Sequence, residues 1–187
     1  MKNTIDRDFV LKFGLLFGLV SIAYSVLAYV LGIDYMVSFK NIVFSVIVGV
    51  VVLFIAGFKL RKLNNNDFPF SQAFKNLMII AILGVFLSVM FDLVLNKVID
   101  PTLQQRVAEA TIEKTMSTMQ NFGVPEEELD KTYQQMRQSY EQNDGSQYSF
   151  MGVLSSFAFA SVFWIIPVLI VSLVAKKTND SPFEKNE

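Results

Sequence analysis

The 187-residue sequence contains no cysteine and no histidine. The first absence excludes disulfide bonds, thiolate nucleophiles and cysteine metal sites, and the second excludes imidazole ligands and histidine general-base catalysis. Most familiar enzyme mechanisms depend on one of these side chains. We therefore expect a protein that is not an enzyme and that holds no metal ion and no other cofactor.

Charged residues are also scarce, and they are unevenly placed. They make up 18% of the chain, against about a quarter in typical soluble domains. The net charge of −1 gives no basic field for a phosphate backbone, so we expect no nucleic-acid partner. The charges avoid four long segments, which contain much of the 52% hydrophobic content.

These four segments, residues 13–31, 41–58, 77–95 and 150–175, are the most informative feature of the sequence. Each is 18 to 26 residues long, and a helix rising about 1.5 Å per residue then crosses a hydrocarbon layer of about 30 Å. Lipid demands that backbone hydrogen bonds be satisfied within the segment, which favours helices. The sequence predicts an all-α integral membrane protein, a four-helix bundle whose direct partner is the lipid bilayer. Pro167 in the last segment predicts a kink.

A polar stretch, residues 96–149, separates the third and fourth predicted spans. Asp100 and Pro101 are typical of the start of a helix, and Gly123 is typical of its end. Pro125 followed by three glutamates starts a second helix, with acidic residues at the positive end of its dipole. The stretch is predicted to form a helical hairpin with helices at about residues 101–122 and 125–142.

Lysine and arginine are concentrated on one side of the predicted spans. The connection between the second and third spans has four basic residues against one acidic residue. The N-terminal flank, residues 1–12, has three basic residues, and the C-terminal flank, residues 176–187, begins with two lysines. Cytoplasmic segments carry such an excess. We expect a protein of the inner (cytoplasmic) membrane with both termini in the cytoplasm, a disordered C-terminal tail and residues 96–149 outside the cytoplasm.

The first helix of the predicted hairpin has two apolar stripes on different faces. A helix in an isolated pair needs only one apolar face. The second stripe therefore predicts contact with a third surface, which makes this helix the candidate partner face. The residues of the two stripes are Leu103, Val107 and Ala110, then Ile112, Met116 and Met119.

Asp92 is the one charged residue within the four apolar segments. An ionisable side chain inside a membrane is costly and indicates a functional site by default. Lys40, Asn41 and Asn96 are expected near the same membrane boundary and complete a candidate polar site. Two interpretations stay open: structural pairing or hydration near the interface, and a role in moving protons or ions.

Gly14 and Gly18 form a GxxxG motif on the first predicted span. Small residues at this spacing let two helix backbones approach closely. The motif predicts a helix-packing seam, formed either with another span of the same chain or with a second copy or a protein partner.

Four short motifs follow one another along the chain: Lys12-Phe13-Gly14-Leu15-Leu16-Phe17-Gly18-Leu19, Phe70-Ser71-Gln72-Ala73-Phe74-Lys75, Ile99-Asp100-Pro101 and Lys176-Lys177. In this order and spacing they resemble an uncharacterised membrane-protein family found mainly in Bacteroidota, domain of unknown function 4199. The resemblance covers roughly residues 8–177 and implies a four-helix inner-membrane protein. It implies no activity.

The preferred functional hypothesis is a non-catalytic membrane subunit, accessory or scaffolding, whose outer hairpin contacts a protein partner or a second copy. The alternative is a small oligomeric transporter or channel that uses Asp92. One membrane acid, without discontinuous helices of the kind that line binding sites, gives transport little support. An intramembrane enzyme has the least support, because no second membrane acid is available to pair with Asp92.

Overall fold

Helices make up almost all of the regular structure. The computed structural model describes residues 2–142 and 148–177. Within them, the one extended pairing outside the helices is an isolated antiparallel β-bridge between Phe68 and Lys177. The all-α prediction is confirmed. Most of the predicted disordered tail lies outside the described residues.

Four helical segments are long and apolar enough to cross a membrane, as predicted. These segments are Arg7–Leu31, Phe39–Leu63, Phe70–Ile99 and Phe150–Ala175. Several extend beyond the apolar windows of the sequence into flanking polar residues. The helices are α1 (Lys2–Leu31), α3 (Phe39–Leu63), α4 (Phe70–Val94), and the consecutive pair α7 (Phe150–Phe163) and α8 (Ile165–Ala175).

The last span is interrupted at Trp164. α7 ends at Phe163, and α8 begins just after Trp164. Pro167 explains the position of the break, because it has no N–H to donate to the carbonyl of Phe163 and its ring crowds that carbonyl. Helical bonding continues on both sides, since Trp164 N donates to Ala160 O (3.3 Å) and Val168 N donates to Trp164 O (3.0 Å). Pro167 thus interrupts the helix about one turn before its own position.

The chain divides into two compact units. Unit 1 comprises Met1–Ile22, Ser45–Ser88 and Ala158–Glu187, and unit 2 comprises Ala23–Phe44 and Val89–Phe157. The helices α1, α3, α4 and α7 contribute residues to both units.

Two aromatic side chains seated on glycines form the centre of unit 1. Phe17 of α1 lies against Gly84 of α4, and Trp164 lies against Gly49 of α3. The two rings meet edge to face, with centroids 5.1 Å apart, which is a favourable arrangement for aromatic pairs. Fully buried aliphatic side chains in the same core are Leu53, Leu60, Leu77, Ile80, Val168 and Val171.

At one end of unit 1, the loop between α3 and α4 is tied to the residues that follow α8. Phe68 N donates to Lys177 O (2.6 Å), and Lys177 N donates to Phe68 O (2.9 Å). The loop turns through Asn65 and Asn66, whose φ values of 55° and 61° lie in the left-handed region. Asparagine tolerates this region better than most residues. Asn64, which precedes them, is fully buried.

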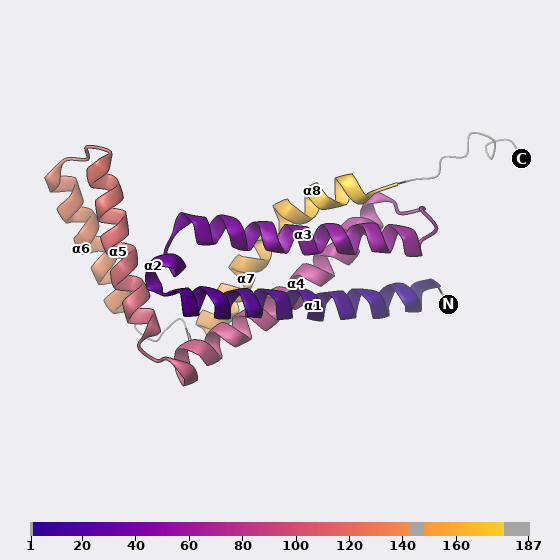
Figure 1. Cartoon of the computed structure of the whole chain (residues 1–187), viewed down its shortest axis with the longest axis horizontal. Helices are drawn as coiled ribbons and strands as arrows, with labels where there is room; N and C mark the ends of the chain where they lie inside the picture. Colours follow the sequence, from indigo (N-terminus) through magenta and orange to yellow (C-terminus); the bar gives the residue numbers. More distant parts are fainter. Residues whose placement is uncertain (1, 143–147, 178–187) are drawn as a thin grey trace, which may run out of the picture. The chain divides into compact units, whose positions relative to one another are not determined.

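Unit 2 contains the polar segment of the chain. Its elements, besides the parts of the long helices, are α2 (Ile33–Met36), the π-helical turn η1 (Leu95–Ile99), α5 (Leu103–Asn121) and α6 (Glu126–Gln142). α5 packs along α6, and it also contacts α2 (Figure 1). No sequence pattern indicated α2, which provides α5 with a second neighbour.

α5 ends at a glycine in the left-handed conformation. Gly123 has φ 75°, and its N–H donates to Gln120 O (2.9 Å). Val124 N donates to Met119 O (3.1 Å). These two bonds form a Schellman motif, which satisfies carbonyls at the end of a helix and favours glycine at this position.

The start of α5 differs in detail from the expectation. The sequence pattern placed Pro101 at the first helical position, whereas α5 begins at Leu103. Asp100 Oδ1 accepts hydrogen bonds from Thr102 N (3.2 Å) and Thr102 Oγ1 (2.8 Å). Asp100 therefore stabilises an Asx turn that leads into the helix and does not cap its first turn.

Candidate functional site

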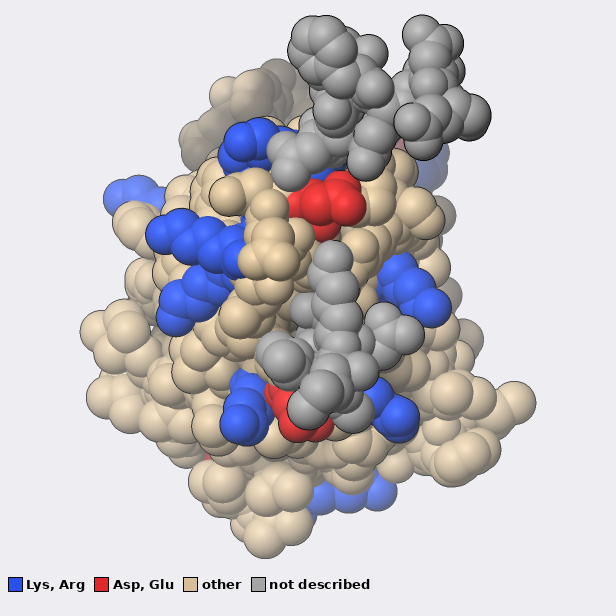
Figure 2. All heavy atoms as spheres, turned by 90° about the vertical axis from the view of Figure 1, so that its right-hand side faces the viewer, with Lys and Arg blue, Asp and Glu red and all other residues tan. Residues whose placement is uncertain are grey.

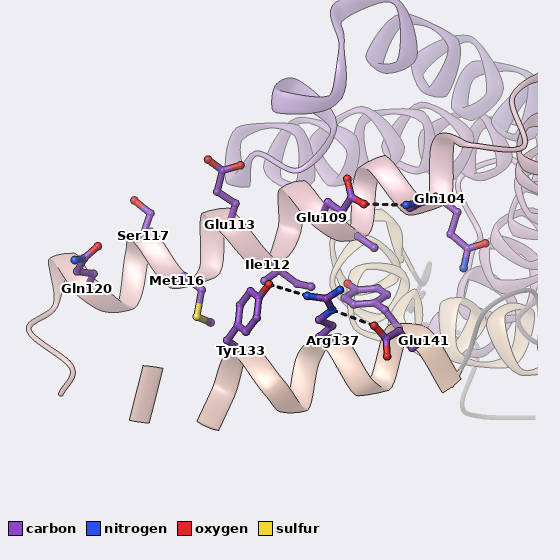
Figure 3. A pocket seen from close by; sticks show the side chains of 13 residues that line it. Gln104, Glu109, Ile112, Glu113, Met116, Ser117, Gln120, Tyr133, Arg137 and Glu141 are labelled. Carbon is purple, nitrogen blue, oxygen red and sulfur yellow. Dashed lines mark hydrogen bonds and ion pairs between the residues drawn. The ribbon is translucent and has the colours of Figure 1, made fainter. Parts of the chain in front are cut away.

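An elongated groove of about 930 Å³ runs along the α5–α6 pair (Figure 3). On α5, Ala108 and Ile112 are buried and Met116 is half-buried, and their spacing of four residues places them on one helix face. Ile112 and Met116 point toward α6 (Figure 3). On α6, Tyr133 and Tyr140 are each 37% exposed. The groove therefore combines an apolar floor with accessible aromatic side chains.

Charged side chains line the same groove. Arg137 Nε donates to Glu141 Oε1 (3.0 Å), and Arg137 Nη1 donates to the Tyr133 hydroxyl (3.4 Å). The hydrogen bond to Glu141, followed by that to Tyr133, raises the pKa of Arg137. Glu109 and Glu113 of α5 bring the lining to three carboxylates against one guanidinium. This balance favours a cationic over an anionic ligand.

The acidic side chains do not form a metal site. Among residues 2–142 and 148–177, no group of three or more acidic side chains is placed to hold a metal ion. Glu109 Oε1 instead accepts a hydrogen bond from Gln105 Nε2 (3.0 Å) one turn earlier. Within these ranges, the carboxylates of the groove are therefore not arranged as a metal-binding cluster.

Some residues of the predicted partner face line the groove, and the others lie elsewhere on α5. Ile112 and Met116 line the groove, whereas the other stripe residues are not among its lining residues. Because α5 has both α6 and α2 as neighbours, its apolar faces make contacts within unit 2. Of the remaining stripe residues, Leu103 is buried, and Val107, Ala110 and Met119 are half-buried.

Sequence reasoning missed Ala108, Arg137 and Glu141 in this groove. Ala108 lies one turn before Ile112, and its small side chain leaves space that a larger residue would fill. Arg137 and Glu141 are spaced as a helical ion pair, which is a recognisable signal. The signal did not show that the pair faces α5, because that depends on how the two helices pack.

Asp100 connects the end of α1 to the start of α5 within unit 2. Its Oδ2 accepts a hydrogen bond from the Tyr29 hydroxyl (3.0 Å) and also pairs with Arg106 Nη2. The hydroxyl of Thr102, then the hydroxyl of Tyr29 and the charge of Arg106, hold the pKa of Asp100 below its usual value. The sequence indicated Asp100 only as a helix start, so both long-range partners were missed.

The predicted polar site around Asp92 is not joined by side-chain bonds. Asp92 is exposed on α4, and Asn96 Nδ2 donates to its backbone carbonyl (2.8 Å). Asn41 Oδ1 instead accepts a hydrogen bond from the Tyr24 hydroxyl (2.9 Å), and Lys40 is exposed. Within the described ranges, no hydrogen bond or ion pair connects the Asp92 carboxylate to Lys40, Asn41 or Asn96.

The glycines of the predicted packing seam lie against α4 in unit 1. A Cβ atom added to Gly14 would be 2.8 Å from Leu83 Cβ, and one added to Gly18 would be 2.7 Å from Leu87 Cβ. Real Cβ atoms do not approach so closely, so only glycine allows this separation of the two helices. The contact observed for the motif is therefore the one with another span of the same chain.

Four apolar segments of membrane-spanning length, together with a polar helix pair that carries a groove, define a multi-span α-helical membrane protein. The chain belongs to the family described as Protein of unknown function (DUF4199), whose model matches residues 12–177. The family resemblance of the four sequence motifs is thereby confirmed. No curated protein and no solved structure matches the chain. The family description names no activity, so a functional assignment depends on the features of the chain itself.

Proposed function

We propose that this chain is a non-catalytic subunit of the inner membrane that binds another protein through the groove between α5 and α6. In this proposal both termini are cytoplasmic and residues 96–149 lie outside the cytoplasm. The observation that carries the proposal is the groove itself, which places buried apolar residues beside accessible tyrosines and charged groups. Such a mixture is typical of protein-contact surfaces, where aromatic residues and arginine are enriched.

An exposed aromatic residue lies at the end of α5, just beyond the last lining residue of the groove on that helix. The side chain of Phe122 is 83% exposed, next to the Schellman motif that connects α5 to α6. A phenyl ring exposed to this extent buries little apolar area against the helix pair itself. It offers apolar area that a protein partner is able to bury.

The distribution of basic residues supports the proposed orientation. Lys and Arg side chains are spread over the end of unit 1 seen in Figure 2, and fewer acidic side chains are visible among them. Cytoplasmic ends of membrane proteins carry such an excess. The basic residues that flank the spans there are Arg61 and Lys62 at the end of α3, Lys75 near the start of α4, and Lys176 and Lys177 after α8.

Photo-crosslinking in native membranes tests the contact. A photoreactive residue at Gln120, which lines the groove, should give a discrete adduct with another protein. The same residue at Gln138, which is exposed on α6 but does not line the groove, is the matched control. The proposal predicts that Ala108→Trp, which fills the groove, abolishes the adduct. Equal adducts from both positions, or none from Gln120, would contradict it.

Thiol labelling tests the orientation, and the absence of cysteine makes every single-cysteine variant unambiguous. A cysteine at Gln134 of α6 should react with a membrane-impermeant reagent in spheroplasts, in which the outer membrane is opened and the inner membrane is intact. A cysteine at Asn66, in the loop between α3 and α4, should react only after the membrane is permeabilised. The reverse pattern would place α5 and α6 in the cytoplasm.

A transporter or channel that uses Asp92 is a second candidate, supported by one observation. Asp92 is exposed as a whole residue, and its carboxylate forms no ion pair with any residue that the structure describes. An unpaired acid in an apolar span is able to exchange a proton or hold a cation. Flux into proteoliposomes that Asp92→Asn abolishes, while Ser88→Ala leaves it intact, would favour this candidate over the binding subunit.

A further inference from the structure

Resting on the proposed function, we infer that the occupant of the α5–α6 groove is a basic amphipathic helix of another protein. Its apolar ridge would contact Met116, Tyr133 and Tyr140, above the floor of Ala108 and Ile112, which are already buried within the chain. Lysine or arginine residues beside the ridge would face the carboxylates of the groove. The inference rests on the shape of the groove, on its charges and on the poor match that the groove offers to other occupants.

The shape of the groove fits a helix. The lining residues on α5 extend from Gln104 to Gln120, which is about 24 Å at 1.5 Å per residue. A partner helix of about sixteen residues covers that length. The α5 floor repeats every four residues, and Tyr133, Arg137 and Tyr140 on α6 follow helical spacing as well. Ridges with this repeat accept the ridge of a third helix, which would complete a three-helix arrangement.

The charges of the groove select a basic partner. Glu113 is exposed, and in the described part of the chain its carboxylate has no hydrogen bond or ion pair. It is therefore available to a cation from outside. Arg137 shows that the groove accommodates a guanidinium, since it lies between the Tyr133 hydroxyl and the Glu141 carboxylate. A partner arginine would meet the same kinds of groups.

A second copy of this chain is a poor match for the groove. A two-fold contact places the same surface on both sides of the interface. The acidic lining residues, Glu109, Glu113 and Glu141, would then face their own counterparts, with one Arg137 on each side to offset them. Like charges brought together in this way oppose association.

The surface of an anionic membrane is also disfavoured as the occupant. α5 and α6 together carry seven acidic and four basic residues. Anionic lipid headgroups attract protein segments that carry an excess of basic residues. The excess of carboxylates therefore repels such a surface and attracts a cationic segment.

Binding of two synthetic peptides to the full chain in zwitterionic nanodiscs tests the inference, with empty nanodiscs as the blank. The first peptide is a sixteen-residue helix with a leucine–alanine ridge flanked by lysines, and the second has glutamate in place of each lysine. Fluorescence anisotropy of the labelled peptides should show saturable binding of the basic peptide only. Ala108→Trp should abolish it, and Ser117→Lys, at an exposed position of the lining, serves as a second block that does not disturb the buried floor.

Two charge reversals separate groove binding from general attraction. Glu113→Lys in the groove should weaken binding of the basic peptide about fivefold. Glu128→Lys in the first turn of α6 changes the net charge equally, lies outside the groove and should leave binding unchanged. Equal losses for the two variants, or equal binding of the acidic peptide, would overturn the inference.

The remaining outcomes distinguish the occupant from the proposed function. If the basic peptide fails to bind while the Gln120 crosslink to another protein persists, the chain is a binding subunit whose partner is not a basic helix. If the Gln120 crosslink joins two copies of this chain, the occupant is a second copy and the inference is wrong. If neither the peptide nor the crosslink is observed, both proposals fail.

Discussion

The indole of Trp164 lies so close to Gly49 that a Cβ atom at position 49 would overlap the ring. The same indole meets the ring of Phe17 edge to face, with planes at 85°. Phe17 in turn lies against Gly84. Two large rings thus fit in the centre of unit 1 because two small residues face them. The packing of α1, α3, α4 and the α7–α8 junction depends on this match of sizes.

Gly49→Val should therefore destabilise the protein by about 1–3 kcal/mol, because the added carbons have no space beside Trp164. Thermal or denaturant unfolding in mild detergent measures the change. Val51→Leu is the control, since Val51 lies on the same helix and is 49% exposed. Trp164→Phe should recover part of the loss in the double variant, and strictly additive losses would contradict direct contact.

Gly18→Leu should lower stability by a similar amount, about 1–3 kcal/mol, because Leu87 of α4 occupies the space beside Gly18. Leu19→Phe, at a neighbouring side chain that is 61% exposed, should have little effect. Native mass spectrometry provides the decisive comparison. A seam within the chain leaves the oligomeric state unchanged in Gly18→Leu, whereas a dimer seam would release monomers.

Asp100→Asn should loosen the start of α5, because the amide loses the charge that pairs with Arg106 while Tyr29 keeps only a neutral acceptor. Hydrogen–deuterium exchange should show faster exchange at the first turn of α5. Glu109→Gln, an exposed carboxylate on the same helix that bonds only within it, is the matched control. Exchange rates equal to those of the unaltered chain would show that Asp100 is not an anchor.

The same anchor should respond to acid. Thr102, followed by Tyr29 and Arg106, lowers the pKa of Asp100 in the folded chain. A lowered folded pKa means that the contribution to stability is complete above the unfolded pKa, about 4, and is lost as the pH falls through the lower folded value. Protection of the amides at the start of α5, taken as exchange relative to the intrinsic rate at each pH, should therefore fall below about pH 4 in the unaltered chain. Asp100→Asn should lack this step.

Lys177→Pro should destabilise the end of unit 1 by about 1–3 kcal/mol, because Phe68 O loses its donor at a buried position. Lys176 has φ −56° and ψ 141°, which a following proline permits, so the change removes the hydrogen bond without straining its neighbour. Lys177→Ala keeps the backbone bond and should be neutral. If both variants unfold at the same temperature as the unaltered chain, the bridge contributes nothing to stability.

Local composition was sufficient to predict the class of the protein and the position of its helices. A run of about eighteen or more apolar residues without charge has one stable solution in lipid, a helix, whatever surrounds it. Gly123 ended α5 as the pattern indicated, because a left-handed cap is a property of one residue and its nearest neighbours. Pro167 interrupted the last span for the equally local reason that it lacks an N–H group.

Local composition did not reveal α2, because a single helical turn of four residues has no periodic pattern to recognise. It also placed Asn41 and Asp92 in one polar site from their expected depth alone. The two side chains point in different directions. Asn41 Oδ1 accepts a hydrogen bond from the Tyr24 hydroxyl, and the Asp92 carboxylate forms no hydrogen bond with Asn41. Depth in a membrane is readable from position along a helix, but the direction of a side chain depends on the rotation of each packed helix.

The sequence by itself thus determined the apolar spans, the polar segment and the ends of its helices, because each follows from the physical properties of neighbouring residues. Only the tertiary structure decided that Gly14 and Gly18 face Leu83 and Leu87 within one chain, and that α5 and α6 enclose a groove. These features depend on which side chains meet across elements that are distant in sequence. These contacts depend on the rotation of each helix about its axis and on the sizes of the facing side chains. Both are determined by the packing of the whole unit.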